Sequence, residues 1–292
     1  MNYDDLPLLG KTALVTGVSR RRGIGFAVAR RLATLGANLC IHHFADHDRQ
    51  QPWGGDQLDA VRAELRSAQV DGATFTDVSA DLSDSASVTA VIERATTLTG
   101  TIEILVCNQA VSGTDGSILD MTPSRLDTHW SVNTRATLLL TSEFARRKAG
   151  VHDGDSPRHP GEKITKTEQF SQPTGHVIWL TSGQLHGPMV GEVAYAASKA
   201  ALAGVTATVA AELLQLGIVL NTINPGPVNT GYMDPETTDR SLDALEEYRA
   251  STPFGRYGQP TDPANLVGWL VSSEGSWIVG QVMTSDGGFS LI

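Results

Sequence analysis

The sequence predicts an α/β fold with one parallel sheet and helices on both of its faces. Apolar runs with strand character alternate with helical segments along the chain, as in successive βαβ units. The strand runs are apolar throughout, as expected of parallel strands buried on both sides. With 292 residues and 40% hydrophobic side chains, the chain can bury a full core. We expect one doubly wound domain over residues 1–292.

The predicted elements follow one another in a regular order. Strands are expected at 12–15, 38–43, 74–78, 102–107, 175–181 and 218–222, and near 282. Helices are expected at 23–35, 57–67, 85–98, 123–148 and 195–214, and after 261. Segments 44–56 and 151–174 have the composition of surface insertions, and 231–254, with a helix at 241–249, suits a mobile substrate lid.

Composition excludes several classes of function. Lys and Arg total 22 against 32 Asp and Glu, and the net charge of -10 argues against general binding to nucleic acid or anionic membranes. The first ten residues lack a basic, apolar leader, and no apolar run reaches the roughly 20 residues of a membrane span. Cys40 and Cys107 lie in apolar strand runs, which favours buried thiols. We expect a soluble protein of the cytoplasm.

A glycine-rich turn follows the first predicted strand. It consists of Thr16, Gly17, Val18, Ser19, Arg20, Arg21, Arg22, Gly23, Ile24 and Gly25. Glycines let the backbone approach a pyrophosphate at the N-terminus of the next helix, where free amides favour an anion. Arginine binds phosphate in a bidentate manner, so the arginine run predicts an additional phosphate on the ligand; a solvated basic loop is the alternative.

The end of the second strand also bears on the cofactor. An NAD-specific enzyme would offer Asp or Glu to the ribose there, whereas this chain has His42, His43 and Phe44. NADP(H) is therefore preferred over NAD(H), with His43 expected near the adenosine phosphate. The His and Asp residues of 42–48 could also suggest a metal site, but a strand end cannot aim them all at one point. We predict no metal.

Three residues form the central catalytic prediction. Tyr195 and Lys199 are four apart at the start of an alanine-rich helix, so both project from one face, and the ammonium would favour tyrosinate. Ser182 ends the preceding strand, at the carboxyl edge of the sheet where open α/β sheets bind ligands. The three predict an acid/base site beside a bound nucleotide.

With these residues the chain resembles the short-chain dehydrogenase/reductase family, which has a Rossmann-like fold. The resemblance extends from Leu9 almost to the C-terminus. The family's motifs match the turn at 16–25, Asp81 and Leu82, Asn108, Asn133, Ser182, Tyr195 with Lys199, Pro225 and Gly226, Thr230, and 286–288. The loop between Gly17 and Gly23 is two residues longer than usual, and the Asn-Asn-Ala-Gly element keeps only Asn108. The resemblance adds Asp81, Leu82, Asn108, Pro225, Gly226, Val228 and Thr230 to the cofactor site.

The resemblance also implies a mechanism. For reduction, Tyr195 would donate a proton to the substrate oxygen, Ser182 would hydrogen-bond that oxygen, and Lys199 would tune Tyr195 and hold the nicotinamide ribose. Asn133 would hold a water that supplies protons to Lys199, and Thr230 would orient the carboxamide. Among family members the chain resembles the 3-oxoacyl-(acyl-carrier-protein) reductases.

The substrate and the assembly follow as expectations. A 3-oxoacyl thioester is the leading substrate, followed by a small ketone, a sugar or a polycyclic alcohol. An enoyl substrate is disfavoured, because that group separates its Tyr and Lys by more residues. A non-catalytic NADP(H)-binding sensor is the remote alternative. Arg146, Arg147 and Lys148 could dock an acidic carrier protein or simply complement a helix dipole, and the apolar helix at 196–211 suggests a homotetramer or homodimer.

Overall fold

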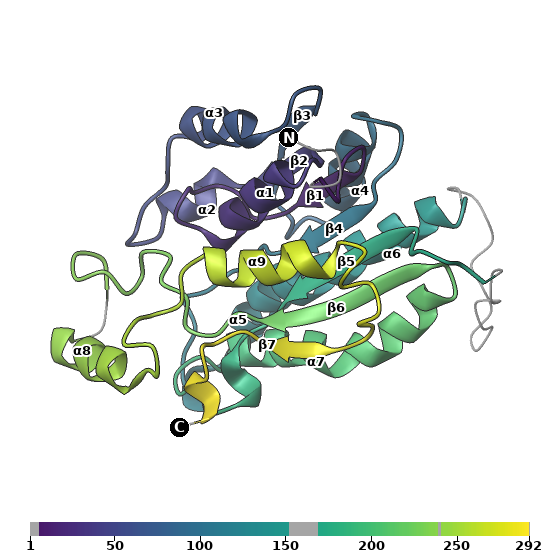
Figure 1. Cartoon of the computed structure of the whole chain (residues 1–292). Coiled ribbons are helices and arrows are strands. Elements are labelled where there is room, and N and C mark those ends of the chain that lie inside the picture. Colours follow the sequence, from purple (N-terminus) through teal and green to yellow (C-terminus); the bar gives the residue numbers. More distant parts are fainter. Residues whose placement is uncertain (1–5, 152–168, 239–240, 292) are drawn as a thin grey trace.

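The sheet contains seven strands, all parallel. The computed structural model describes residues 6–151, 169–238 and 241–291. Within this part the strand order is β3-β2-β1-β4-β5-β6-β7 (Figure 1). The strands are β1 (Thr12–Val15), β2 (Asn38–His43), β3 (Phe75–Ser79), β4 (Ile104–Cys107), β5 (Gly175–Leu180), β6 (Ile218–Asn224) and β7 (Val282–Thr284). The predicted parallel α/β class is confirmed.

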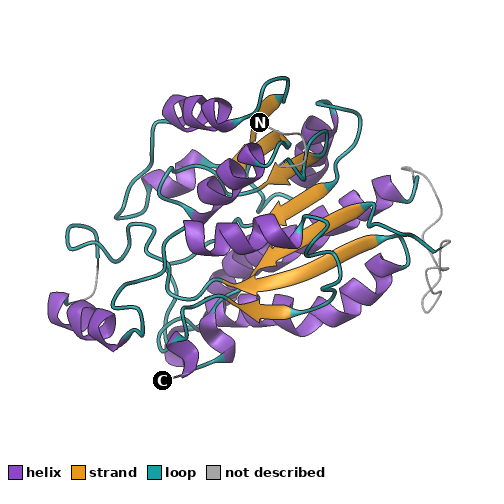
Figure 2. Ribbon diagram, in the orientation of Figure 1, coloured by secondary structure: helices purple, strands orange, loops and turns teal. Residues whose placement is uncertain are grey.

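Helices cover both faces of this sheet (Figure 2). One core layer unites β-strand side chains such as Val15 with helices α1 (Ile24–Thr34), α3 (Leu58–Ala68) and α9 (Thr261–Leu270). The other unites strand side chains such as Leu14 with α4 (Ala86–Thr96), α6 (Ala136–Lys148) and α7 (Val193–Leu214). Neighbouring strand residues point to opposite faces, and both faces are buried, which explains the uninterrupted apolar strand runs.

The predicted helix over 123–148 is interrupted. It consists of α5 (Pro123–His129), a π-helical segment (Trp130–Arg135) and α6. Gln109 donates from Nε2 to the Val132 carbonyl at 3.2 Å, so a side chain from the end of β4 uses a carbonyl of the widened turn. Side chains inserted into the helical hydrogen-bond ladder are a recognised cause of such distortions, which often lie at functional sites.

One of the two predicted surface insertions contains a helix. Segment 44–56 contains the short helix α2 (Ala45–Arg49), so the expectation of a loop was wrong there. Most of 151–174 lies outside the described residues. Helix α8 (Leu242–Ser251) occupies the predicted lid, close to the expected bounds of 241–249. Three short 3₁₀ turns, at Ile118–Asp120, Gly183–Leu185 and Phe289–Leu291, complete the described structure.

Helix α7 meets the length and hydropathy test for a membrane span. It nevertheless packs along β6 and against the π-helical segment, and it buries Ser198, Lys199 and Leu202. Buried helices of α/β folds pass the same test, and we assign α7 to the core.

The strand order places a crevice at the carboxyl edge of the sheet. The chain runs outward from β1 through β2 to β3 and then returns to β4 on the other side of β1. At such a switch point the loops after neighbouring strands diverge and leave room for a ligand. The predicted site residues after β1, β4, β5 and β6 all belong to this edge.

Candidate active site

A cleft of about 800 Å³ runs along the carboxyl edge. Its walls come from the loops that follow β1 to β6 and from the first turn of α7. Fourteen of the predicted cofactor residues line it: Gly17, Ser19, Arg20, Gly23, Ile24, Asp81, Leu82, Asn108, Tyr195, Lys199, Pro225, Gly226, Val228 and Thr230. The described structure thus brings most of the sequence-predicted site into one cavity.

The glycine-rich turn forms one end of the cleft and is closely packed. Gly17 has a φ of +71°, and a Cβ there would lie 2.8 Å from Asn108 Nδ2. A Cβ on Gly25 would lie 2.5 Å from the Gly17 carbonyl oxygen, so this glycine is needed for packing behind the cleft. Helix α1 starts here with no side-chain cap and no acidic residue in its first turn. Free amides at a helix N-terminus fit the pyrophosphate of a dinucleotide.

The three consecutive arginines have different surroundings. Arg20 lines the cleft, donating from Nη1 to the Thr230 carbonyl at 2.8 Å and from Nε to Asp48 at 3.0 Å. Burial lowers the pKa of Arg20, although Asp48 opposes the shift. Arg21 instead binds Asp56 and Glu64, outside the cleft.

Arg22 does not line the cleft either. Its guanidinium pairs with Asp234 at 2.5 Å. All three arginines pair with acidic side chains, and the run offers one guanidinium to the cleft rather than three.

The prediction that His43 lies near the adenosine phosphate was wrong, because His43 does not line the cleft. Since alternate strand residues face opposite sides, it is His42 that lines the cleft, with Nε2 2.9 Å from the Ala80 carbonyl oxygen and Nδ1 accepting from Gly17 N at 3.3 Å. Burial lowers the pKa of His42 to about 4, so the ring is neutral at pH 7. His43 is buried behind the strand with Nε2 2.9 Å from Asp77 Oδ2, and it does not reach the adenosine side of the cleft.

Tyr195, Lys199 and Ser182 meet at the other end of the cleft. The Lys199 ammonium lies 5.8 Å from the Tyr195 ring centroid and donates to the Leu180 carbonyl at 2.8 Å. Ser182 was expected to end the strand but lies two residues after β5; its Oγ is 4.0 Å from the Met189 sulfur. All three residues line the same cavity as the glycine-rich turn.

Burial shifts the acid/base properties of this group. It raises the pKa of Tyr195 to about 12, an effect that a hydrogen bond with Ser182 opposes. It lowers the pKa of Lys199 to about 8. The phenol is therefore protonated at pH 7, and the amine changes its charge close to physiological pH. Titratable groups with shifted pKa values in a cleft are typical of catalytic sites.

Asn133 lies behind the cleft rather than in its wall. Its Oδ1 accepts from Val111 N at 2.7 Å, and its Nδ2 donates to Ser198 Oγ at 2.9 Å. Ser198 in turn donates to the Tyr195 carbonyl at 2.7 Å. Asn133, which was predicted to hold a water, thus hydrogen-bonds the loop after β4 and, through Ser198, the first turn of α7.

Two contributors to the cleft escaped the sequence analysis. Gln109 connects the end of β1 to the helix, since its amide contacts Thr16 Oγ1 and donates to Thr137 Oγ1 at 2.9 Å. Trp53, from the 44–56 insertion, also lines the cleft, with the Arg20 guanidinium 5.6 Å from its ring and the Tyr232 ring 6.3 Å away. The insertion, the glycine-rich loop and the predicted lid therefore meet over the nucleotide side.

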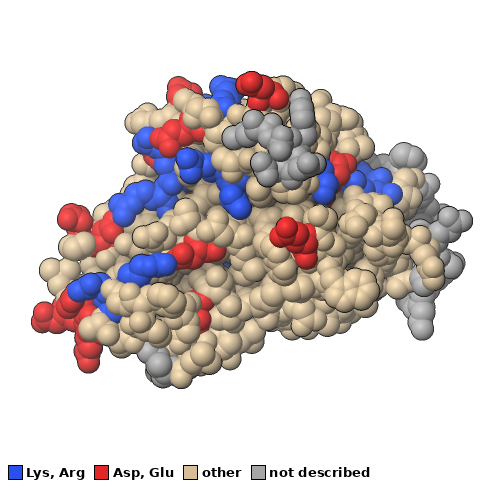
Figure 3. Space-filling view, in the orientation of Figure 1, with Lys and Arg blue, Asp and Glu red and all other residues tan. Residues whose placement is uncertain are grey.

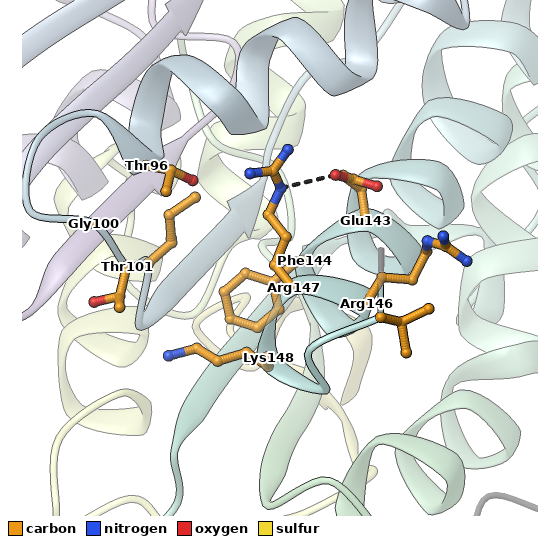
Figure 4. A pocket seen from close by; sticks show the side chains of 10 residues that line it. Thr96, Gly100, Thr101, Glu143, Phe144, Arg146, Arg147 and Lys148 are labelled. Carbon is orange, nitrogen blue, oxygen red and sulfur yellow. Dashed lines mark hydrogen bonds and ion pairs between the residues drawn. The ribbon is translucent and has the colours of Figure 1, made fainter. Parts of the chain in front are cut away.

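Arg146, Arg147 and Lys148 line a separate cavity of about 320 Å³ (Figure 4). Arg147 points toward Glu143 and bonds it at 2.8 Å, and Lys148 pairs with Glu103 at 3.3 Å. The cavity also borders Ile102, which precedes β4, so it lies at the amino edge of the sheet. The basic cluster and the cleft are consequently on opposite edges. Within the described ranges, no group of three or more His, Cys, Asp or Glu side chains is arranged to hold a metal ion.

Comparisons with known proteins agree with this geometry. A family model described as "Enoyl-(Acyl carrier protein) reductase" matches residues 17–154 and 163–290. The "Uncharacterized oxidoreductase YjdA" of Bacillus subtilis is 34% identical over 281 residues, covering 96% of both chains.

Two solved structures are also similar. A short-chain dehydrogenase from Burkholderia cenocepacia in complex with NADP is 29% identical, with a TM-score of 0.75 and coverage of 97% of this chain and 99% of that one. A 3-oxoacyl (acyl-carrier-protein) reductase from Agrobacterium tumefaciens with NADP bound is 26% identical, with a TM-score of 0.74 and coverage of 98% and 97%.

Proposed function

The chain belongs to the short-chain dehydrogenase/reductase family of NAD(P)-dependent oxidoreductases, and on this premise we propose that it is an NADP(H)-dependent carbonyl reductase. One observation carries the proposal: Tyr195, Lys199 and Ser182 line the same cleft as the glycine-rich turn. These residues would place an acid/base group beside a dinucleotide held by the glycine-rich turn. When bound, the cofactor supplies or accepts the hydride.

Residues of this chain handle the proton and position the substrate oxygen. Tyr195, protonated at pH 7, donates its proton to the oxygen of the substrate carbonyl, and Ser182 donates a hydrogen bond to the same oxygen. The Lys199 ammonium stabilises the tyrosinate that remains. In alcohol oxidation the proton moves in the opposite direction. Asn133 supports this machinery from behind through Ser198.

The preference for NADP(H) depends on Arg20. It is the one arginine of the run 20–22 that lines the cleft, and β2 ends on histidines rather than on the acid that would bind a ribose diol. The bound NADP in the two similar structures supports the same preference. Asp48 forms an ion pair with Arg20, so a bound phosphate would compete with Asp48 for the guanidinium.

A 3-oxoacyl thioester is the substrate we favour. The similar 3-oxoacyl reductase structure and the carrier-protein wording of the matched family model support an acyl substrate. Tyr195 and Lys199 are four residues apart, which favours reduction of the carbonyl over reduction of an enoyl double bond. Segment 231–254, including α8, would close over the acyl chain as a lid. The basic cluster of Arg146 lies on the edge opposite the cleft, so we place no carrier-protein dock there.

Assembly into a homo-oligomer is part of the proposal. Two tryptophans near the C-terminal end of the described chain are exposed, Trp269 of α9 by 39% and Trp277, between α9 and β7, by 95%. On the face shown in Figure 3, most acidic and basic side chains lie in the upper and left parts, whereas a broad area below α9, around β7, carries few of them. A monomer of 31.0 kDa in light scattering at micromolar concentration would contradict this.

The function is tested by consumption of NADPH, and separately of NADH, with a panel of carbonyl compounds. Acetoacetyl thioesters head the panel, followed by small ketones, aldehydes and oxidised sugars, with crotonyl thioesters as the enoyl comparison. We expect turnover with NADPH on a carbonyl and none on the enoyl compound. Turnover of the crotonyl thioester alone would overturn the reaction type, and turnover with NADH alone would overturn the cofactor preference.

A further inference from the structure

The loop after β4 reaches the first turn of α7 and holds it. Asp115, on this loop, accepts hydrogen bonds from the backbone amides of Ala194 at 3.0 Å and Tyr195 at 2.7 Å. The Val193 amide adds a bond to the Gly116 carbonyl at 3.3 Å. Glu192, the residue that precedes α7, makes no side-chain capping bond to the helix. The first turn of α7 is therefore capped by a residue about eighty positions upstream in the sequence.

The carboxylate is enclosed on its other side. The Asp115 side chain is 4% exposed, and His129 Nε2 faces Asp115 Oδ2 at 4.0 Å. Nδ1 of His129 lies 2.9 Å from the Arg125 carbonyl oxygen, and its buried Nε2 has no other partner among the described atoms. A buried carboxylate is costly unless hydrogen bonds and positive charge or dipoles surround it, and here the amide end of a 22-residue helix supplies them.

The backbone before Asp115 is unusual. Thr114 has a φ of +50°, the one positive value of a non-glycine residue in the described ranges. β-branched residues rarely adopt this region, and such outliers persist where the surrounding contacts hold them in place. Here the turn directs the next side chain toward α7. The cleft is lined by Thr114, Asp115 and Tyr195, so the contact between this loop and α7 lies within the site itself.

We propose that Asp115 is a positioning residue for Tyr195, which sets the place of the phenol by holding the backbone amide of the same residue. The proposal depends on the proposed reductase function. The amide bond fixes the root of the Tyr195 side chain, while Ser198 fixes its carbonyl at 2.7 Å. Together these contacts hold both ends of one residue. A displacement of about 1 Å at a reacting group can cost about a hundredfold in rate.

The test compares Asp115→Ala and Asp115→Asn with Asp120→Ala. Asp120 is a matched control on the same loop, because it is exposed and bonds Ser117 rather than α7. We expect Asp115→Ala to lower kcat by about a hundredfold, with the NADPH dissociation constant within about twofold of wild type. Asp115→Asn keeps an acceptor oxygen for one amide and should recover about tenfold of that loss. Asp120→Ala should leave kcat within about twofold of wild type.

Three outcomes would overturn the proposal. The first is a wild-type kcat in Asp115→Ala. The second is a loss of NADPH affinity in Asp115→Ala as large as the loss of kcat, which would indicate a general structural role. If the alanine variant does not fold, a wild-type kcat in Asp115→Asn would overturn it as well.

Hydrogen exchange separates this proposal from the proposed function. The Ala194 and Tyr195 amides should exchange faster in Asp115→Asn than in Asp120→Ala, whether or not a substrate has been found. Equal exchange in the two variants would contradict the capping role itself. Absence of turnover in the wild-type protein, by contrast, would count against the reductase function alone.

Discussion

The Lys199 ammonium lies 5.8 Å from the centroid of the Tyr195 ring, and its Nζ donates to the Leu180 carbonyl at 2.8 Å. This backbone bond fixes the lysine at the carboxyl end of β5, directly before the segment that carries Ser182. A cation is thus held beside a phenol that is neutral at pH 7. The arrangement favours proton donation, because the charge stabilises the tyrosinate left behind.

The reduction rate should depend on the charge of Lys199. Burial lowers the pKa of Lys199 to about 8 and raises the pKa of Tyr195 to about 12. As the pH rises through about 8, Lys199 loses its charge while Tyr195 keeps its proton, so kcat for reduction should fall. Lys199→Arg keeps the charge and should remove this fall, at a lower kcat. A wild-type kcat that rises across pH 7–9 would contradict the assignment.

Arg20 should determine the preference for NADPH over NADH. Arg20→Ala is expected to raise KM for NADPH by about tenfold to a hundredfold and to change KM for NADH little, since a charge-assisted phosphate contact contributes about 1.5–3 kcal/mol. Arg21→Ala is the matched control, because Arg21 binds Asp56 and Glu64 outside the cleft. Steady-state kinetics with both cofactors give the ratio. An equal effect of the two substitutions would remove Arg20 from the phosphate site.

Buried histidine should make the fold sensitive to acid. Burial lowers the pKa of His176 from 6.5 to about 4, with the Lys11 charge adding to the effect. Between pH 6.5 and pH 4, His176 binds a proton in the unfolded chain but not in the folded chain. The free energy of unfolding therefore falls as the pH decreases from 6.5 to 4. The contribution is about 3 kcal/mol.

His176→Leu provides the comparison for that window. His176 lies at the start of β5, on the edge of the sheet opposite the cleft, so the variant should remain active. Urea unfolding at pH 6.5 and pH 4 should show a smaller loss of stability in the variant than in the wild type. An equal loss in both proteins would show that His176 does not contribute.

The fold was largely predictable because its pattern is local. Parallel strands buried on both faces produce apolar runs such as β4, and the glycines at 17 and 25 mark a turn that no larger residue fits. The spacing of Tyr195 and Lys199 is also local, since one helix face carries both. What could not be predicted depends on tertiary partners. The π-helical segment contains the Val132 carbonyl that Gln109 binds, and Arg21 is held outside the cleft by Asp56 and Glu64.

Asp115 illustrates the same limit at the site. It lies in a polar loop with no motif around it, and its role becomes visible only when the loop is seen against the first turn of α7. The position of His43 is a different case. Strand alternation determines which of the two neighbouring histidines faces the cleft, and an error of one residue in register reverses the answer.

The most direct test of the account is the Tyr195→Phe variant in NADPH-dependent reduction. The substitution removes the hydroxyl and leaves the ring that packs beside Lys199. We predict that kcat with the best carbonyl substrate of the wild type falls by about a thousandfold, while the NADPH dissociation constant stays within about twofold. Retention of wild-type turnover in this variant would contradict the assignment of Tyr195 as the proton donor.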